Sequence, residues 1–153
     1  MSNTSAGAGL EKMLEATRLD ACKVLALPRF ADDRGVLTFV EGGNHIPFPI
    51  ARIFYLYGVP HDSVRAGHAL KTCAQLVVAL NGSFDVLLKD GLTEKTLTLN
   101  DPAKALIIPP RIWREIMNFS DGCVCLVLAS DPYDEKAYYD YYDEYLEAVG
   151  RKK

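Results

Sequence analysis

The stretch RAGHALKTCAQLVVALNGSFDVLLKDG, residues 65–91, is the part of the sequence that most clearly indicates the fold. Two short apolar runs, 73–80 and 83–89, flank Asn81-Gly82, and the second run ends at Asp90-Gly91. Asn-Gly and Asp-Gly form tight hairpin turns because both residues of each pair adopt positive φ at low cost. The stretch therefore predicts antiparallel β-strands joined by hairpins.

Similar short apolar segments recur along most of the chain, with turn-forming residues between them. The expected strands lie at 22–27, 36–41, 50–57, 73–80, 83–89, 95–100, 104–109, 112–119 and 123–130. Short strands at regular spacing, without helical segments between them, favour an antiparallel sandwich or barrel over a fold of alternating strands and helices.

The C-terminal segment has a different pattern. Asp131-Pro132 and the acidic residues that follow are typical of a helix start, and Gly150 is a typical helix stop. Its tyrosines recur at helical spacing and are expected to pack on the barrel. We therefore expect one domain, with an N-terminal arm at 1–20, a barrel at 21–130 and a C-terminal helix at 131–150.

Composition excludes several classes of protein. The 153 residues carry a net charge of -3, and no basic cluster suggests a nucleic-acid surface. No apolar run approaches the length of a membrane span, and the first 20 residues lack the layout of a signal peptide. Four cysteines without CxxC spacing are typical of reduced thiols. We expect a cytoplasmic protein that binds neither nucleic acid nor membrane.

Two spacings resemble the motifs of cupin barrels, His-x-His-x4-Glu-x6-Gly and Pro-x-Gly-x2-His-x3-Asn. The first motif falls on His68, Leu70, Gln75 and Gly82, and the second on Pro109, Arg111, Arg114 and Asn118. The expected fold is thus an all-β, antiparallel cupin or jelly-roll barrel with a C-terminal α-helix. Of the metal-binding groups only His68 is present, and Arg114 would bring a positive charge, so we expect no metal.

The arginines near this motif indicate an anionic ligand. Arg52, Arg65 and Arg114 all lie in strand-like or strand-bordering segments beside a concave barrel interior. A buried guanidinium requires an anion to neutralise it. A ligand phosphate and an ordinary salt bridge within the protein are two alternatives that both stay open.

Two long stretches, residues 33–91 and 106–146, resemble the sugar 3,4-ketoisomerases that act on dTDP-4-oxo-6-deoxy-D-glucose. The most specific part is Trp113-Arg114-Glu115 followed by LVLASDPYDE at 126–135. The resemblance implies a cupin fold, a dTDP-linked 4-keto-6-deoxyhexose as substrate, no cofactor and no metal, and a homodimer. It also implies a place in deoxy-aminosugar biosynthesis.

The resemblance assigns roles to individual residues. It implies that His68 is the base that removes the C3 proton, with Tyr55 and Arg114 as further catalytic residues. A neutral imidazole with a pKa near 7 is suited to take a proton from C3 and return it to C4. The expected substrate-binding residues are Arg52, Arg65, Lys71 and Gln75.

Leu70 departs from the resemblance, because these isomerases carry a second histidine there. His68 could make both proton transfers alone, or the product could be a different isomer. A third alternative is a non-catalytic protein that binds the nucleotide sugar. A related dTDP-sugar epimerase acting at C3 and C5 is a weaker alternative, since no aspartate partner for His68 is evident.

Overall fold

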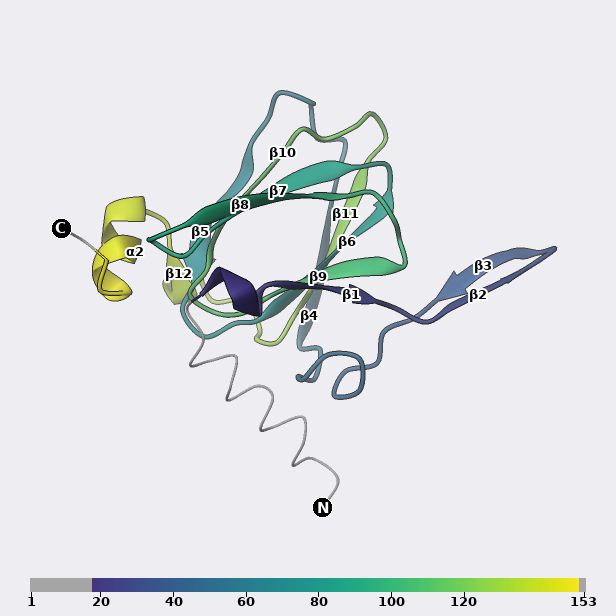
Figure 1. Cartoon of the computed structure of the whole chain (residues 1–153), viewed down its shortest axis with the longest axis horizontal. Coiled ribbons are helices and arrows are strands. Elements are labelled where there is room, and N and C mark those ends of the chain that lie inside the picture. The colour runs from purple at the N-terminus through teal and green to yellow at the C-terminus, as the bar shows by residue number, and fades with distance from the viewer. Residues whose placement is uncertain (1–17, 152–153) are drawn as a thin grey trace, which may run out of the picture.

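Two five-stranded antiparallel sheets face one another and enclose the interior of a barrel (Figure 1). The computed structural model describes residues 18–151. The first sheet has the order β1 (Lys23–Ala26), β9 (Lys104–Ile108), β6 (Gln75–Asn81), β11 (Val124–Ala129) and β4 (Arg52–Tyr57). The second has the order β12 (Tyr138–Tyr139), β5 (Arg65–Leu70), β10 (Trp113–Met117), β7 (Phe84–Lys89) and β8 (Glu94–Leu99). The predicted antiparallel cupin-type barrel is confirmed.

Alternation along the strands explains how the core fills. In β7, Phe84, Val86 and Leu88 are fully buried, whereas the residues between them are only partly buried. This period of two places every second side chain inside the barrel. The Asn81-Gly82 turn leads from β6 to β7, but the tight hairpin expected there is wrong, because the two strands lie in different sheets and, of the pair, only Gly82 has a positive φ, of 69°. The hairpin expected at Asp90-Gly91 is confirmed, since β7 pairs with β8.

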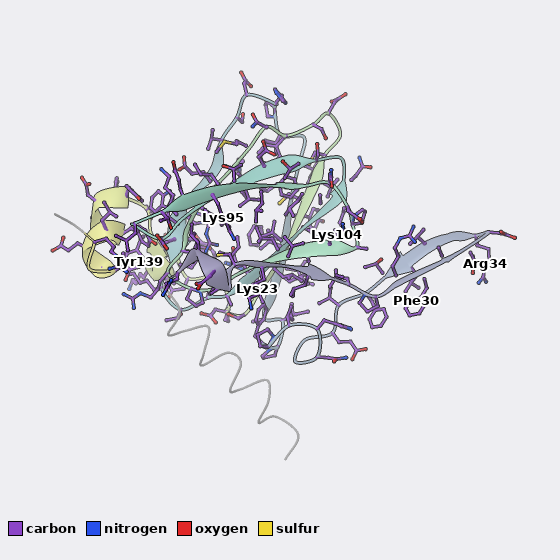
Figure 2. All side chains as sticks on the ribbon, in the orientation of Figure 1. Lys23, Phe30, Arg34, Lys95, Lys104 and Tyr139 are labelled. Atoms are coloured by element: carbon purple, nitrogen blue, oxygen red, sulfur yellow. The ribbon has the colours of Figure 1, made fainter. Side chains whose placement is uncertain are left out.

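A separate hairpin extends from the barrel. It consists of β2 (Arg29–Asp32) and β3 (Gly35–Thr38), and it projects far from the two sheets (Figures 1 and 2). Phe30 near its middle is 61% exposed. A hairpin that is exposed on both faces buries too little apolar surface to be stable alone. Strand β2 was not among the segments expected from the sequence.

The C-terminal segment is less helical than the sequence pattern predicts. Helix α2 covers only Tyr142–Ala148, and the segment before it forms the 3-10 turn η2 (Glu135–Ala137) and strand β12. The expectation of a helix over 131–150 is wrong because Tyr138 and Tyr139 pair with β5 instead. The packing expectation is confirmed for Tyr145, which is fully buried beside Trp113.

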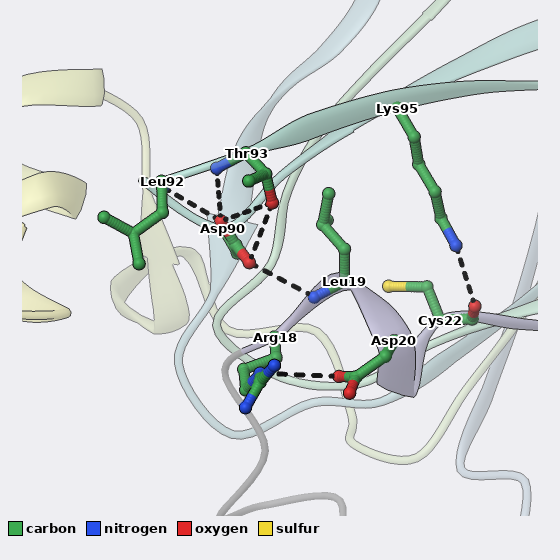
Figure 3. Close-up of polar contacts among 8 residues, drawn as sticks. All are labelled: Arg18, Leu19, Asp20, Cys22, Asp90, Leu92, Thr93 and Lys95. Carbon is green, nitrogen blue, oxygen red and sulfur yellow. Dashed lines mark hydrogen bonds and ion pairs between the residues drawn. The ribbon is translucent and has the colours of Figure 1, made fainter.

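Asp90 attaches the start of the described chain to the barrel (Figure 3). The short 3-10 helix η1 (Leu19–Ala21) begins at Leu19, whose N–H donates to Asp90 Oδ2 at 3.3 Å. Asp90 Oδ1 accepts from the N–H groups of Leu92 and Thr93 at 2.9 and 2.8 Å. Most of the expected arm at 1–20 lies outside the described residues.

The Asp90 carboxylate has a pKa below its ordinary value. Burial raises the pKa, but the hydrogen bonds from Thr93, Leu92 and Leu19 lower it by more. A carboxylate whose pKa is lowered in the folded state stabilises the protein above its unfolded pKa. That contribution is lost as the pH falls through the folded pKa.

Replacing Asp90 by Asn tests this attachment. The amide keeps one acceptor oxygen but presents N–H donors to the Leu19 N–H, so we expect the free energy of unfolding at pH 7 to fall by about 1–3 kcal/mol. The deficit should shrink as the pH falls below 4, as measured by urea denaturation. Asp85→Asn, whose bonds to Thr98 and Asn118 are exposed, is the control. Equal stability of Asp90→Asn and wild type at pH 7 would contradict the account.

Candidate active site

A β-bulge in β5 turns two polar side chains toward the inside of the barrel. Arg114 of β10 is the register partner of His68, and the next partner pair skips Gly67. Ala66 and Gly67 have positive φ values of 67° and 72°, a conformation that costs a non-glycine residue about 1–3 kcal/mol. Because of the extra residue, Arg65 and His68 line the same cavity although they are three positions apart.

The cavity lies between the two sheets and has a volume of about 90 Å³. Its apolar walls include Phe54, Leu56, Val77, Ile108, Ile116 and Val127, and its polar lining is Arg65, His68, Gln75 and Arg114. Ligand pockets are usually at least about 300 Å³ in volume, so this space suits only the reacting end of a larger ligand. Arg65 is exposed, so the cavity reaches the surface on its side.

Arg114 is a buried cation without an ionic partner. Its side chain is 1% exposed, and Nη1 donates to Gln75 Oε1 at 2.7 Å. Nε and Nη2 donate to the Ile112 carbonyl oxygen at 3.1 and 2.9 Å. Within residues 18–151 no carboxylate forms an ion pair with this guanidinium. Burial lowers the pKa of Arg114 to about 10, so the group remains charged at neutral pH.

His68 is held as a neutral imidazole. Burial, as the largest cause, together with the positive charges of Arg114 and Arg52 lowers its pKa from 6.5 to about 4. A proton on this ring would lie in a poorly solvated place beside two cations. The expectation of a pKa near 7 is therefore wrong, but the ring is unprotonated at neutral pH, as a general base must be.

Arg52 and Tyr138 lie next to His68. The Arg52 Nη2 group donates to the Tyr138 hydroxyl at 3.1 Å, and the Tyr138 ring centre is 4.8 Å from that of His68. Arg52 also lies over the Phe54 and Tyr133 rings, at 5.3 and 5.4 Å from their centres. These contacts join β4, β5 and β12 around the imidazole.

Five of the seven expected site residues gather in this region, and two do not. Tyr55 is 59% exposed on the outer face of β4, since it is three positions from Arg52 on a strand whose side chains alternate. Lys71 follows β5, and its ammonium lies 5.2 Å from the centre of the Tyr139 ring. The expectation that Tyr55 and Lys71 join His68 is not met within one chain.

The sequence pattern missed Tyr138 as a site residue. Its spacing to the later tyrosines favoured a packing face on a helix, whereas it lies in a two-residue strand. The available signal was the adjacent pair Tyr138-Tyr139, because aromatic residues are enriched in strands. Arg111, at the glycine position of the second cupin motif, is also outside the cavity, and its Nη2 donates to the Ala148 carbonyl oxygen at 2.7 Å.

The side chains around His68 do not fit the metal centre that many cupins hold. A first-row cation needs several imidazole or carboxylate groups that converge on one point. Here the corresponding positions supply Leu70, Gln75 and the Arg114 guanidinium. Across residues 18–151, no three His, Cys, Asp or Glu side chains are grouped to hold a metal ion.

Comparison with known proteins gives consistent matches. The family model described as "FdtA: WxcM-like, C-terminal" matches residues 20–150. A TDP-4-oxo-6-deoxy-alpha-D-glucose-3,4-oxoisomerase from Aneurinibacillus thermoaerophilus is 39% identical over 129 residues, which cover 84% of this chain and 93% of the relative.

Solved structures agree with this match. The sugar 3,4-ketoisomerase QdtA from Thermoanaerobacterium thermosaccharolyticum, in complex with TDP, has a TM-score of 0.85 and 40% identity, covering 88% of this chain and 98% of that one. A variant of QdtA in complex with TDP-4-keto-6-deoxyglucose has a TM-score of 0.83 and 40% identity, covering 85% of this chain and 94% of that one.

In the described part of this chain, no helix is long and apolar enough to cross a membrane.

The neutral state of His68 predicts acid sensitivity. Because the unfolded chain binds a proton near pH 6.5 and the folded chain only near pH 4, stability should fall as the pH is lowered between these values. The loss is at most about 1.4 kcal/mol per pH unit. His68→Gln should remove this part of the loss in denaturation curves measured from pH 7 to pH 4. His61→Gln, outside the cavity, is the control and should leave this loss of stability unchanged. An identical pH dependence of wild type and His68→Gln would contradict the lowered pKa of His68.

Proposed function

Because the chain belongs to the sugar 3,4-ketoisomerase family, we propose that it moves the keto group of dTDP-4-oxo-6-deoxy-D-glucose from C4 to C3. The observation that carries the proposal is the pairing of a neutral His68 imidazole with the buried, uncompensated Arg114 guanidinium across β5 and β10. A base and a fixed positive charge are the two groups that enolisation of a ketone requires. The reaction belongs to deoxy-aminosugar biosynthesis.

His68 is the group that moves the carbon-bound proton. Its neutral imidazole removes the proton from C3, and the electron pair of that C–H bond forms the C3–C4 double bond while negative charge develops on O4. The proton of the O3 hydroxyl moves to O4 as the C3 carbonyl forms, and the imidazolium returns a proton to C4. Atoms and electrons balance, since the substrate and the product are isomers.

Arg114 stabilises the charge that develops during this step. Its guanidinium is fixed by Gln75 and the Ile112 carbonyl, so it needs no reorganisation when the enediolate forms. A preorganised donor of this kind contributes about 3–4 kcal/mol to transition-state stabilisation in other enzymes. Gln75 is thus a positioning residue that holds the Arg114 guanidinium in place.

Arg52 and Arg65 are proposed to bind the diphosphate of the nucleotide sugar. Within residues 18–151 neither forms an ion pair with a carboxylate. A guanidinium without an ionic partner favours a bidentate contact with phosphate oxygens. Arg65 lines the exposed side of the cavity, where a nucleotide would enter.

We place the reaction in the cytoplasm. All four cysteines are unpaired and buried. Burial raises the pKa of Cys22 to about 11 and that of Cys125 to about 12, so both thiols stay protonated. Buried thiols that remain reduced are typical of a reducing compartment.

Turnover in deuterated water tests the proposed activity. Wild-type protein incubated with dTDP-4-oxo-6-deoxy-D-glucose should form a 3-keto sugar that carries deuterium at C4, followed by NMR. His68→Asn removes the base and should lower kcat by at least about a hundredfold, whereas His45→Asn, outside the cavity, should retain activity. Binding of the sugar without product or deuterium uptake would contradict the isomerase and support the non-catalytic alternative.

A homodimer is the assembly we propose. The outer face of the first sheet and the base of the β2–β3 hairpin enclose an apolar hollow of about 650 Å³, larger than the cavity at His68. Its lining includes Val36, Ile53 and Leu80, which are 57%, 58% and 46% exposed. Exposed apolar surface of this extent is typical of a protein interface. The exposed hairpin and this hollow would cover each other's apolar side chains in a second copy.

Charge placed in the hollow tests the dimer. Ile53→Glu combined with Val36→Glu should convert the protein to a monomer in light scattering coupled to gel filtration, because buried unpaired carboxylates strongly oppose association. Thr96→Glu, on the exposed side of β8, should leave the mass unchanged. A wild-type protein that is already monomeric would overturn the proposed assembly.

A further inference from the structure

Tyr138 lies opposite Leu70, which stands where the sugar 3,4-ketoisomerases carry a second histidine. The two are register partners in β12 and β5, and Tyr139 is the partner of Ala69. The Lys71 N–H donates to the Ala137 carbonyl oxygen at 2.9 Å and continues this pairing. Because side chains alternate along a strand, Tyr138 lies on the side of His68 and Tyr139 on the opposite side.

We propose that Tyr138 is a positioning residue of the isomerase site, with Leu70 as its apolar support. Its ring fixes the His68 imidazole, and its hydroxyl fixes the Arg52 guanidinium. This inference rests on the proposed function, since it assigns a role in that reaction.

The ring of Tyr138 restricts the orientation of His68. The two ring centres are 4.8 Å apart and the ring planes meet at 82°, which is an edge-to-face contact. This geometry is one of the favoured arrangements of aromatic pairs. Rotation of the imidazole about its side-chain bonds would break the contact, so the ring nitrogen that faces the cavity is held in one direction.

The hydroxyl of Tyr138 restricts the orientation of Arg52. Among the described residues it is the one hydrogen-bond partner of the Arg52 side chain, at 3.1 Å from Nη2. The Arg52 Nε is buried and has no hydrogen-bond partner in the same part of the chain. Tyr133 and Phe54 contact the faces of the guanidinium, so the phenol sets its in-plane direction.

Leu70 explains why the phenol is directed to Arg52. Its side chain is 1% exposed and packs with Cys73, Ala129 and Tyr138. A hydrocarbon offers the Tyr138 hydroxyl no hydrogen-bonding group that competes with Arg52, whereas an imidazole at this position would offer both a donor and an acceptor. Leu70 is therefore a support for Tyr138.

Two substitutions at Tyr138 separate the ring from the hydroxyl. Tyr138→Phe keeps the ring and should raise KM about three- to tenfold at nearly unchanged kcat, because Arg52 loses its hydrogen bond to the phenol. Tyr138→Met fills the space over Leu70 without a ring and should lower kcat at least about tenfold, because the base is no longer oriented. Tyr139→Phe, which removes the neighbouring hydroxyl on the other face, should change neither constant.

Several outcomes would overturn the proposal. Unchanged KM in Tyr138→Phe overturns the role of the hydroxyl, and unchanged kcat in Tyr138→Met overturns the role of the ring. If Tyr138→Met lowers Tm without changing kcat, the ring contributes only to packing, and the positioning role of Tyr138 is overturned. In each case active wild-type protein leaves the proposed function standing. Wild-type protein without turnover overturns the proposed function, and this inference with it.

The Leu70→His substitution tests whether Leu70 supports Tyr138 or whether the missing histidine limits the rate. If Leu70 supports Tyr138, an imidazole there draws the phenol away from Arg52, and KM should rise without any gain in kcat. A clear gain in kcat, which for an added acid–base group typically reaches about a hundredfold or more, would show that the missing histidine limits the rate and would overturn the proposal.

Discussion

The buried guanidinium of Arg114 is the constraint on which the site depends. It is held by Gln75 and the Ile112 carbonyl oxygen, and no carboxylate in the described chain pairs with it. An uncompensated buried charge costs several kcal/mol, so this guanidinium lowers the stability of the barrel. The same charge lowers the pKa of His68 and lies across the strand pair from that ring. This charge thus adds to the effect of burial in keeping the imidazole neutral, and in the proposed reaction it would favour an anionic intermediate.

The backbone around His68 is as important as the side chains. The left-handed pair Ala66-Gly67 adds one residue to β5 opposite β10, and this bulge places Arg65 and His68 at one cavity. On the other edge of β5, the two-residue strand β12 brings Tyr138 against the imidazole. Both sides of the cavity, the one with His68 and the one with Arg65, are therefore set by irregular features of one strand, and the regular sheets hold that strand in place.

Much of the fold could be predicted from local patterns, and the composition of the site only in part. The Asp90-Gly91 hairpin and the apolar alternation of β7 are local signals, and both were read correctly. The Asn81-Gly82 turn instead links strands of different sheets, which local turn chemistry does not reveal. The spacing of the cupin motifs placed Gln75 and Arg114 near His68, as the structure shows. Tyr55 could have been excluded from the interior, because a regular strand cannot turn Arg52 and a residue three positions later to the same face. Tyr138 could not be placed, since its pairing with Leu70 depends on a contact between distant parts of the chain.

The pKa of His68 tests the account most directly. Titration of the three histidines by NMR should give His68 a pKa well below 6.5, near 4, with the ring neutral across the physiological range. In Arg114→Met, which removes the positive charge but keeps an unbranched side chain, the His68 pKa should rise and yet remain below 6.5, because burial is the larger cause. A wild-type His68 that titrates at 6.5 or above, or one that does not respond to Arg114→Met, would contradict the claim that burial and this guanidinium together lower the pKa of His68.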